Sequence, residues 1–201
     1  FDVAIEGAEK PKRVMAIIPI VIDMLNLEPS FEHHYAAYGF WAPAIKDYTN
    51  LQLMDWMGTK EHRALMEIED PYEYRDRLTM PKFLINACGD QFFLPDSSQF
   101  YFDDLSGPKY LRYIANTSHG LGERLSDVAE GYTAFYEMVV TNQAFPGYSF
   151  SFENEGQRLL VQLDNLPDEI HFWMAENIND GVGADDNERD FRFDRYGAIW
   201  K

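Results

Sequence analysis

The chain has 201 residues and a formal net charge of −17, because 34 Asp and Glu residues outnumber 17 Lys and Arg residues. Nucleic acids and anionic lipids both attract clustered positive charge, so this balance excludes a generic nucleic-acid binder and argues against docking on anionic lipid. Hydrophobic residues make up 46% of the chain and aromatic residues 15%, too much for a disordered acidic tail and enough for a sizeable core.

The longest apolar run covers residues 14–22 and contains Pro19, so it falls well short of the roughly 18–20 residues of a membrane span. The single cysteine, Cys88, excludes an internal disulfide and a Cys-rich zinc site. No cofactor motif is present, and we expect no cofactor.

Apolar segments with breakers between them predict the first elements. Residues 13–18 are rich in Val and Ile and predict a strand buried on both faces, ended by Pro19. Residues 24–80 contain no clear strand, and their aromatic residues and breakers predict several short helices that cover part of the fold. Residues 82–88 predict a second buried strand, closed by a Gly-Asp pair.

Two helices and a third strand are expected next. Asp96 with Gln99 three positions later fits a capping box, which predicts a helix that ends at Gly107. Residues 109–114 predict the third strand, and Ser126 is the expected N-cap of an amphipathic helix. The apolar stripe of that helix consists of Leu125, Val128, Ala129, Tyr132, Phe135, Tyr136, Val139 and Val140.

Apolar strands alternating with helices predict an α/β fold with a parallel sheet. In such sheets, ligands and catalytic groups gather at the carboxyl ends of the strands. Asp23, Asp90 and His119 follow the three predicted strands. For Asp23 we favour helix capping or structural hydrogen bonding over contact with a site.

The pattern changes near residue 145. Residues 148–153 alternate aromatic with polar side chains, and residues 158–163 and 170–175 predict two further strands after turns. This spacing is typical of an antiparallel β-sandwich. We therefore divide the chain into residues 1–144 and an incomplete β-sandwich domain, residues 145–201.

Asp90 and His119 form the sharpest candidate catalytic pair. A carboxylate that accepts a hydrogen bond from one imidazole nitrogen fixes the tautomer, so the other nitrogen can take a proton from a nucleophile. Acid before histidine, each after a parallel strand, is the order used by α/β-hydrolases. The alternative is that Asp90 only caps a turn and His119 is an ordinary loop histidine.

The nucleophile is not evident within the chain. No G-x-S-x-G motif occurs, and a strand-to-helix elbow is missing at each of the serines considered, which are Ser30, Ser97, Ser98, Ser106 and Ser118. Cys88 lies inside an apolar strand, where a buried structural thiol is favoured over a reactive one.

Other patterns are weaker. His33 and His34 are adjacent and so do not share a helix face, and His62 joins them in a metal site only through tertiary structure. The acidic loop at residues 180–190 has oxygen ligands for calcium, but a solvated loop is favoured. The aromatic residues of 31–56 fit an apolar pocket or simple packing equally well.

Three stretches of the chain resemble one protein family. They are RVMAIIPIVIDMLN (13–26), the segment from 70 to 121 with its GDQFFLPDSS and LRYIANTSHGL blocks, and FWMAENIND…ERDFR (172–192). Together they are similar to the PhoPQ-activated pathogenicity-related proteins, a family that includes autocrine proliferation repressors. The resemblance extends over most of the chain.

This resemblance implies an α/β-hydrolase fold with a lid-like helical insertion at residues 24–80, followed by a β-sandwich of immunoglobulin or fibronectin type. It implies that Asp90 is the acid and His119 the histidine of a catalytic triad. The family's nucleophilic serine would lie upstream of Phe1, with residues 1–9 ending the helix after its elbow. A secreted or periplasmic location is also implied.

Two functions follow as expectations. The first is a serine hydrolase that acts on an ester or amide, with Asp90 and His119 as two triad members. The second is a secreted, non-catalytic signalling or binding protein on a hydrolase scaffold, which meets a protein partner through its acidic surface or its β-sandwich.

Three parallel strands without neighbours leave an unpaired sheet edge and an uncovered core. We therefore expect residues 1–201, expressed alone, to be insoluble or molten. Calorimetry tests this, and a sharp cooperative melt would show the expectation to be wrong.

Overall fold

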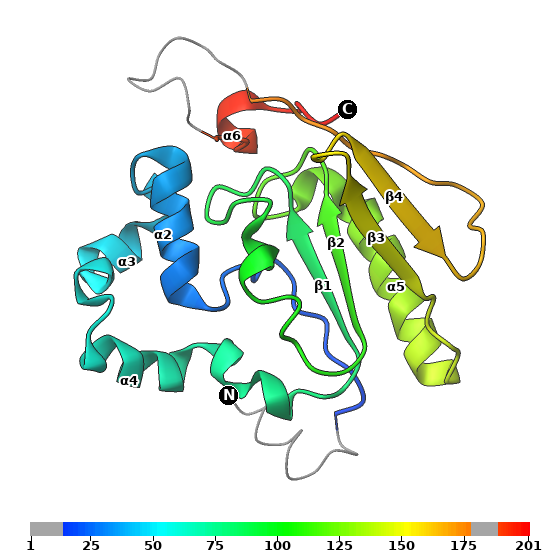
Figure 1. Cartoon of the computed structure of the whole chain (residues 1–201), viewed down its shortest axis with the longest axis horizontal. Coiled ribbons are helices and arrows are strands. Elements are labelled where there is room, and N and C mark those ends of the chain that lie inside the picture. Colours follow the sequence, from blue (N-terminus) through cyan, green and yellow to red (C-terminus); the bar gives the residue numbers. More distant parts are fainter. Residues whose placement is uncertain (1–13, 178–188) are drawn as a thin grey trace.

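The computed structural model describes residues 14–177 and 189–201, and a short parallel sheet lies at its centre (Figure 1). Strands β1 (Lys82–Ala87) and β2 (Lys109–Ile114) pair in parallel from Lys82↔Lys109 to Ala87↔Ile114. Residues 14–21 run along the other side of β1, where parallel bridges join Ile17 to Lys82 and Ile20 to Ile85. The three predicted parallel segments therefore lie side by side, with β1 in the middle.

The prediction of a regular strand that ends at Pro19 is wrong in detail. The described part of this segment makes only isolated bridges, and pairing continues past the proline. The Pro19 carbonyl accepts from the Ile85 amide at 3.0 Å, and the Val21 amide donates to the Ile85 carbonyl at 2.8 Å. Proline lacks an N–H and Val21 has a φ of 50°, so the ladder is interrupted while the parallel course is kept.

Side chains alternate between the two faces of β1 and build two cores. Phe83, Ile85 and Ala87 pack toward Phe135 of helix α5 (Leu125–Thr141). On the opposite face, Leu84 joins a cluster with Leu25, Tyr101 and Leu105. All six residues of β1 are buried, as a central parallel strand requires.

Helix α5 starts two residues earlier than an N-cap at Ser126 requires. Its N-cap residue is Arg124, with no side-chain cap, so Ser126 lies inside the first turn. Phe135 is buried and Val128 packs against the same core, but Leu125 and Tyr136 are 64% and 52% exposed. The predicted apolar stripe is therefore wider than the strip that the narrow sheet covers.

Short helices fill residues 24–80, as predicted. They are α2 (Leu27–Tyr38), η1 (Pro43–Ile45), α3 (Lys46–Asn50), η2 (Leu53–Trp56), α4 (Lys60–Glu69) and η3 (Pro71–Arg77). Gly39 ends α2 with a φ of 73°, which glycine adopts without strain. Asp70 accepts from the amides of Leu27 and Tyr72, both at 2.9 Å, and so joins the start of α2 to the start of η3.

The helix predicted at residues 96–107 is wrong. Only the short η4 (Ser97–Phe100) forms, and the Asp96 side chain caps nothing. Its carboxylate instead contacts His33 Nε2 at 3.0 Å and pairs with Arg189. The predicted capping box needs the Asp96 carboxylate as a hydrogen-bond acceptor, and tertiary ion pairs engage that carboxylate instead.

Two of the three strands predicted after residue 145 are present. Strands β3 (Tyr148–Glu153) and β4 (Arg158–Leu163) form an antiparallel hairpin. Residues 170–175 form no strand, and Met174 instead exchanges backbone hydrogen bonds with Lys201. The β-sandwich is not confirmed, because the described residues contain only two small sheets.

The division at residues 144 and 145 stays a prediction. The final described segment, residues 189–201, contains the short helix α6 (Phe193–Tyr196) and contacts residues before that division. Figure 1 shows α6 at the end of the molecule to which the arrowheads of β1 and β2 point. Within residues 14–177 and 189–201, no helix is long and apolar enough to cross a bilayer.

The central strand gives a test of the fold. Ile85 is fully buried, so Ile85→Ala is expected to lower the free energy of unfolding by about 2–5 kcal/mol. Ile170 is 66% exposed, so the same truncation there should cost less than about 0.5 kcal/mol. Urea unfolding measures both losses, and equal losses would contradict the assigned core.

Candidate functional site

Asp90 and His119 meet at the carboxyl edge of the parallel sheet. Asp90 lies three residues after the end of β1 and His119 five residues after the end of β2. Asp90 Oδ2 is 2.8 Å from His119 Nδ1. The carboxylate side chain is 2% exposed, whereas the imidazole is 29% exposed. The pair therefore has one buried and one accessible member.

The Asp90 carboxylate is fixed by its own chain as well as by the histidine. Asp90 Oδ1 accepts from the Phe92 amide at 2.7 Å and from the Phe93 amide at 3.3 Å. The bond to the residue two positions on is an Asx-turn, which short acidic side chains favour. Both oxygens thus have partners, which offsets the cost of burying the charge.

His119 is held by ring contacts and by its backbone. Its ring lies 4.4 Å from that of Phe92, and its amide donates to Gln91 Oε1 at 3.1 Å. A carboxylate only accepts, so in the neutral imidazole Nδ1 is the nitrogen that carries the proton and Nε2 is the one with the lone pair. Among the described residues, Nε2 has no hydrogen-bond partner. The arrangement leaves one imidazole nitrogen ready to accept a proton.

The loop that carries His119 is closed on itself. Thr117 Oγ1 donates to Glu123 Oε2 at 2.7 Å, and the Ser118 amide donates to the same oxygen at 3.3 Å. The hydrogen bond from Thr117 is the main reason that the pKa of Glu123 lies below its usual range. Asn116 exchanges two hydrogen bonds with the Trp200 backbone, at 2.8 and 2.9 Å.

These supporting residues were not singled out from the sequence. The Asx-turn of Asp90 has a local signal, because an Asp directly after a strand and a Gly is a common turn former. The partners Glu123 and Trp200 have no such signal, since each acts through a contact that the chain pattern does not encode.

Cys88 does not have the surroundings of a nucleophile. It is buried, and burial raises the pKa of its thiol to about 12, with the charge of Asp23 as a second cause. A thiol that stays protonated at neutral pH is a poor nucleophile. Ser118 bonds to Glu123 instead of His119.

Asp23 has a structural hydrogen-bonding role, as favoured from the sequence. It is buried, and its two oxygens accept from Tyr101 at 2.5 Å and from Tyr113 at 2.6 Å. It does not cap α2, whose N-cap residue is Asn26. Burial raises the pKa of Asp23 to about 7, and the nearby charge of Asp90 acts in the same direction.

His33, His34 and His62 do not come together in one site, and each has its own partner. His33 pairs with Asp96, and His34 Nε2 accepts from the Ala42 amide at 3.1 Å, while burial lowers the pKa of His34 to about 4. His62 is buried with its Nδ1 3.5 Å from Glu28. The described residues contain no cluster of three or more metal-binding side chains.

Two further sequence patterns are the acidic loop at residues 180–190 and the aromatic residues of 31–56. Residues 178–188, most of the acidic loop, are outside the described residues. Phe31 and Tyr38 are buried among the short helices of residues 24–80, and the Phe31 ring lies against Trp41 and Tyr48. These aromatic residues therefore pack the short helices against one another.

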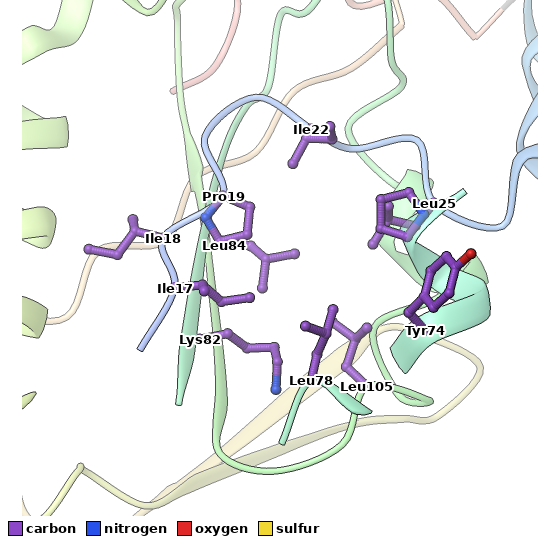
Figure 2. A pocket seen from close by; sticks show the side chains of 11 residues that line it. Ile17, Ile18, Pro19, Ile22, Leu25, Tyr74, Leu78, Lys82, Leu84 and Leu105 are labelled. Atoms are coloured by element: carbon purple, nitrogen blue, oxygen red, sulfur yellow. The ribbon is translucent and has the colours of Figure 1, made fainter. Parts of the chain in front are cut away.

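An apolar cavity of about 370 Å³ lies on the sheet face opposite α5 (Figure 2). Ile17, Ile22, Leu84 and Leu105 line it, and Lys82 is its charged member. Burial lowers the pKa of Lys82 to about 8, and its ammonium donates to the Ser106 carbonyl. Asp90 and His119 are not among the lining residues, so the candidate site and this cavity are separate.

Parallel strands flanked by helices, with an acid–histidine pair at their carboxyl edge, define a protein of the α/β class. The family model of the PhoPQ-activated pathogenicity-related proteins matches residues 5–192, and the chain belongs to that family. The chain is 34% identical over 189 residues to autocrine proliferation repressor protein A of Dictyostelium discoideum. The match covers 90% of this chain and 37% of that relative.

Solved structures similar to the chain are larger enzymes. Acetyl xylan esterase from Paenibacillus sp. R4 is 19% identical with a TM-score of 0.43, over 64% of this chain and 39% of the esterase. Acylaminoacyl peptidase from Pyrococcus horikoshii is 15% identical with a TM-score of 0.43, over 65% of this chain and 21% of the peptidase. The chain thus spans less than half of each of these proteins.

The buried carboxyl of Asp23 gives a pH test. Because the pKa of Asp23 is raised in the native state, its bound proton stabilises that state below about pH 4. This contribution is lost as the pH rises to about 7. Asp23→Asn should remove this pH dependence. Between pH 4 and pH 8 the free energy of unfolding of the variant should therefore rise, relative to that of the unmodified protein, by on the order of 4 kcal/mol. Asp103→Asn, at an exposed position, is the control. Urea unfolding of the natural protein measures the difference, and identical pH profiles for Asp23→Asn and the unmodified protein would contradict the assignment.

Proposed function

We propose that this chain contributes two triad members to a serine hydrolase of the α/β-hydrolase class, which acts on an ester or amide. His119 is the general base and then the general acid, and Asp90 orients it. The nucleophile is a serine from a part of the natural protein outside these 201 residues, as the family resemblance implies.

The single observation that carries this proposal is the 2.8 Å hydrogen bond between Asp90 and His119. It leaves the imidazole in the tautomer that general-base catalysis needs, with Nε2 on the accessible side. The order of acid and histidine, each after a parallel strand, fits the same class.

The chemistry follows from those positions. Nε2 takes the proton of the serine hydroxyl while its oxygen attacks the substrate carbonyl, and the ester or amide bond then breaks as Nε2 returns that proton to the leaving group. Water repeats the cycle and releases the acid. The Asp90 carboxylate stabilises the imidazolium that forms in each half, because it already lies beside Nδ1.

A secreted, non-catalytic signalling protein is the second candidate. The observation that favours it is the 34% identity to a protein named for repressing proliferation. The same fold can serve such a role without catalysing a reaction, because fold does not dictate function. In that case the acid–histidine pair holds two loops together. The chain has a net charge of −17, and its acidic surface binds a protein partner.

Two further assignments accompany the hydrolase proposal. Residues 24–80 act as a lid-like insertion beside the site, and residues 145–201 belong to a second domain. The protein is secreted or periplasmic, which cell fractionation tests directly.

Fluorophosphonate labelling distinguishes the two functions. The natural protein should be labelled, and His119→Ala should abolish labelling because His119 is the proposed acceptor of the serine proton. Asp90→Asn should slow it by about 10³–10⁴-fold through loss of the correct tautomer. His171→Ala, at an exposed histidine paired with Glu169, is the control and should label normally.

A folded natural protein that the probe never labels would overturn the hydrolase proposal. That result would favour the signalling role, in which His119→Ala changes loop stability and nothing else.

A further inference from the structure

The backbone of Gly89, the residue before Asp90, joins three separate segments. Its amide donates to the Thr117 carbonyl at 3.2 Å, and its carbonyl accepts from the Phe193 amide at 2.9 Å. Thr117 lies two residues before His119, and Phe193 begins α6. The loops of both members of the acid–histidine pair and the final segment of the chain therefore meet at this one glycine.

The junction has no spare room. A Cβ atom placed on Gly89 would lie 2.6 Å from the Phe193 Cβ and 2.9 Å from the Thr117 carbonyl oxygen. Contacts this short force a shift of the neighbouring backbone, because neither of these two atoms is the end of a flexible side chain. A displacement of Phe193 is thus passed to the residues beside Asp90 and His119.

Phe193 is in turn held by an ion pair next to it. Arg192 Nε lies 2.9 Å from Asp190 Oδ1, and Arg192 Nη2 lies 2.7 Å from Asp190 Oδ2. The two side chains are 9% and 2% exposed. This bidentate, nearly buried geometry fixes the guanidinium plane in a way that a lysine does not reproduce.

The same guanidinium contacts the helical insertion. Its central carbon lies 5.2 Å from the ring centre of Tyr38 and 5.3 Å from that of Phe40, within the range of cation–π attraction. The Arg189 amide also donates to the Ala37 carbonyl at 2.8 Å. Residues 189–193 therefore lie between the end of α2 and Gly89, with hydrogen bonds or ring contacts on both sides.

We propose that Arg192 is a positioning residue for the acid–histidine pair, which couples the helical insertion to the Asp90–His119 hydrogen bond through Phe193 and Gly89. This inference rests on the proposed hydrolase function for its catalytic consequence, but the coupling itself is a property of the hydrogen bond. Arg192 does not touch the reacting atoms and acts through the backbone alone.

The experiment uses the natural protein and two readouts. The first is the rate of labelling by a fluorophosphonate, and the second is the low-field NMR signal of the His119 Nδ1 proton shared with Asp90. Arg192→Met should slow labelling by about 10-fold to 100-fold and shift or remove the proton signal, because a small misplacement of a base is costly. Arg192→Lys keeps the charge and should restore only part of the rate.

Two controls match these changes. Arg63→Met removes an arginine from an exposed pair with Glu73, and neither readout should change. Gly89→Ala should reproduce the effect of Arg192→Met without touching the ion pair, whereas Gly122→Ala, where a Cβ meets nothing within 4 Å, should be silent.

Removing Arg192 alone leaves the buried Asp190 charge without its main partner, which can unfold the protein. If Arg192→Met does not fold, the double variant Asp190→Asn/Arg192→Met, which removes both charges, and Gly89→Ala decide the question by the same readouts. A folded Arg192→Met, or that double variant in its place, with an unchanged Nδ1 proton signal would overturn the proposal. If the natural protein is never labelled, the hydrolase function fails, and the proton signal still tests the coupling by itself.

Discussion

The burial of the Asp90 carboxylate is the constraint on which the carboxyl edge of the sheet depends. The Asp90 side chain is 2% exposed, and a buried carboxylate is tolerated at low cost only if its oxygens are hydrogen-bonded. Two amides of its own turn donate hydrogen bonds to one oxygen, and His119 Nδ1 is the hydrogen-bond partner of the other. The loops after β1 and β2 must therefore adopt conformations that bring these donors together, and Thr117 and Glu123 fix the second loop accordingly.

Three buried acids lie around the candidate site, and the chemistry of the partner separates their roles. Asp23 faces two tyrosine hydroxyls, which do not offset burial, so its pKa is raised to about 7. Asp190 faces arginine in a bidentate pair, which suits a permanent structural link. Asp90 faces an imidazole, which has a second ring nitrogen that can exchange a proton with another group.

Local sequence patterns predicted the elements better than their ends. β1 and β2 follow from short apolar runs between breakers, and both are present within one residue of expectation. The helix predicted from Asp96 and Gln99 failed because the Asp96 carboxylate binds His33 and Arg189, 63 and 93 positions away. The strand predicted at 170–175 failed because Met174 pairs with Lys201 instead of extending a sheet. In each case a distant partner replaced the local one.

The sequence by itself determined the parallel strands, the short helices of residues 24–80 and the positions of Asp90 and His119 after their strands, because these depend on hydrophobic pattern and turn residues that lie close together in the chain. Tertiary structure alone decided that the final segment reaches back to Gly89 and that Arg192 lies between the end of α2 and the candidate site. Those contacts join residues about 100 or more positions apart, and no local pattern encodes which distant backbone fills the space that a glycine leaves open.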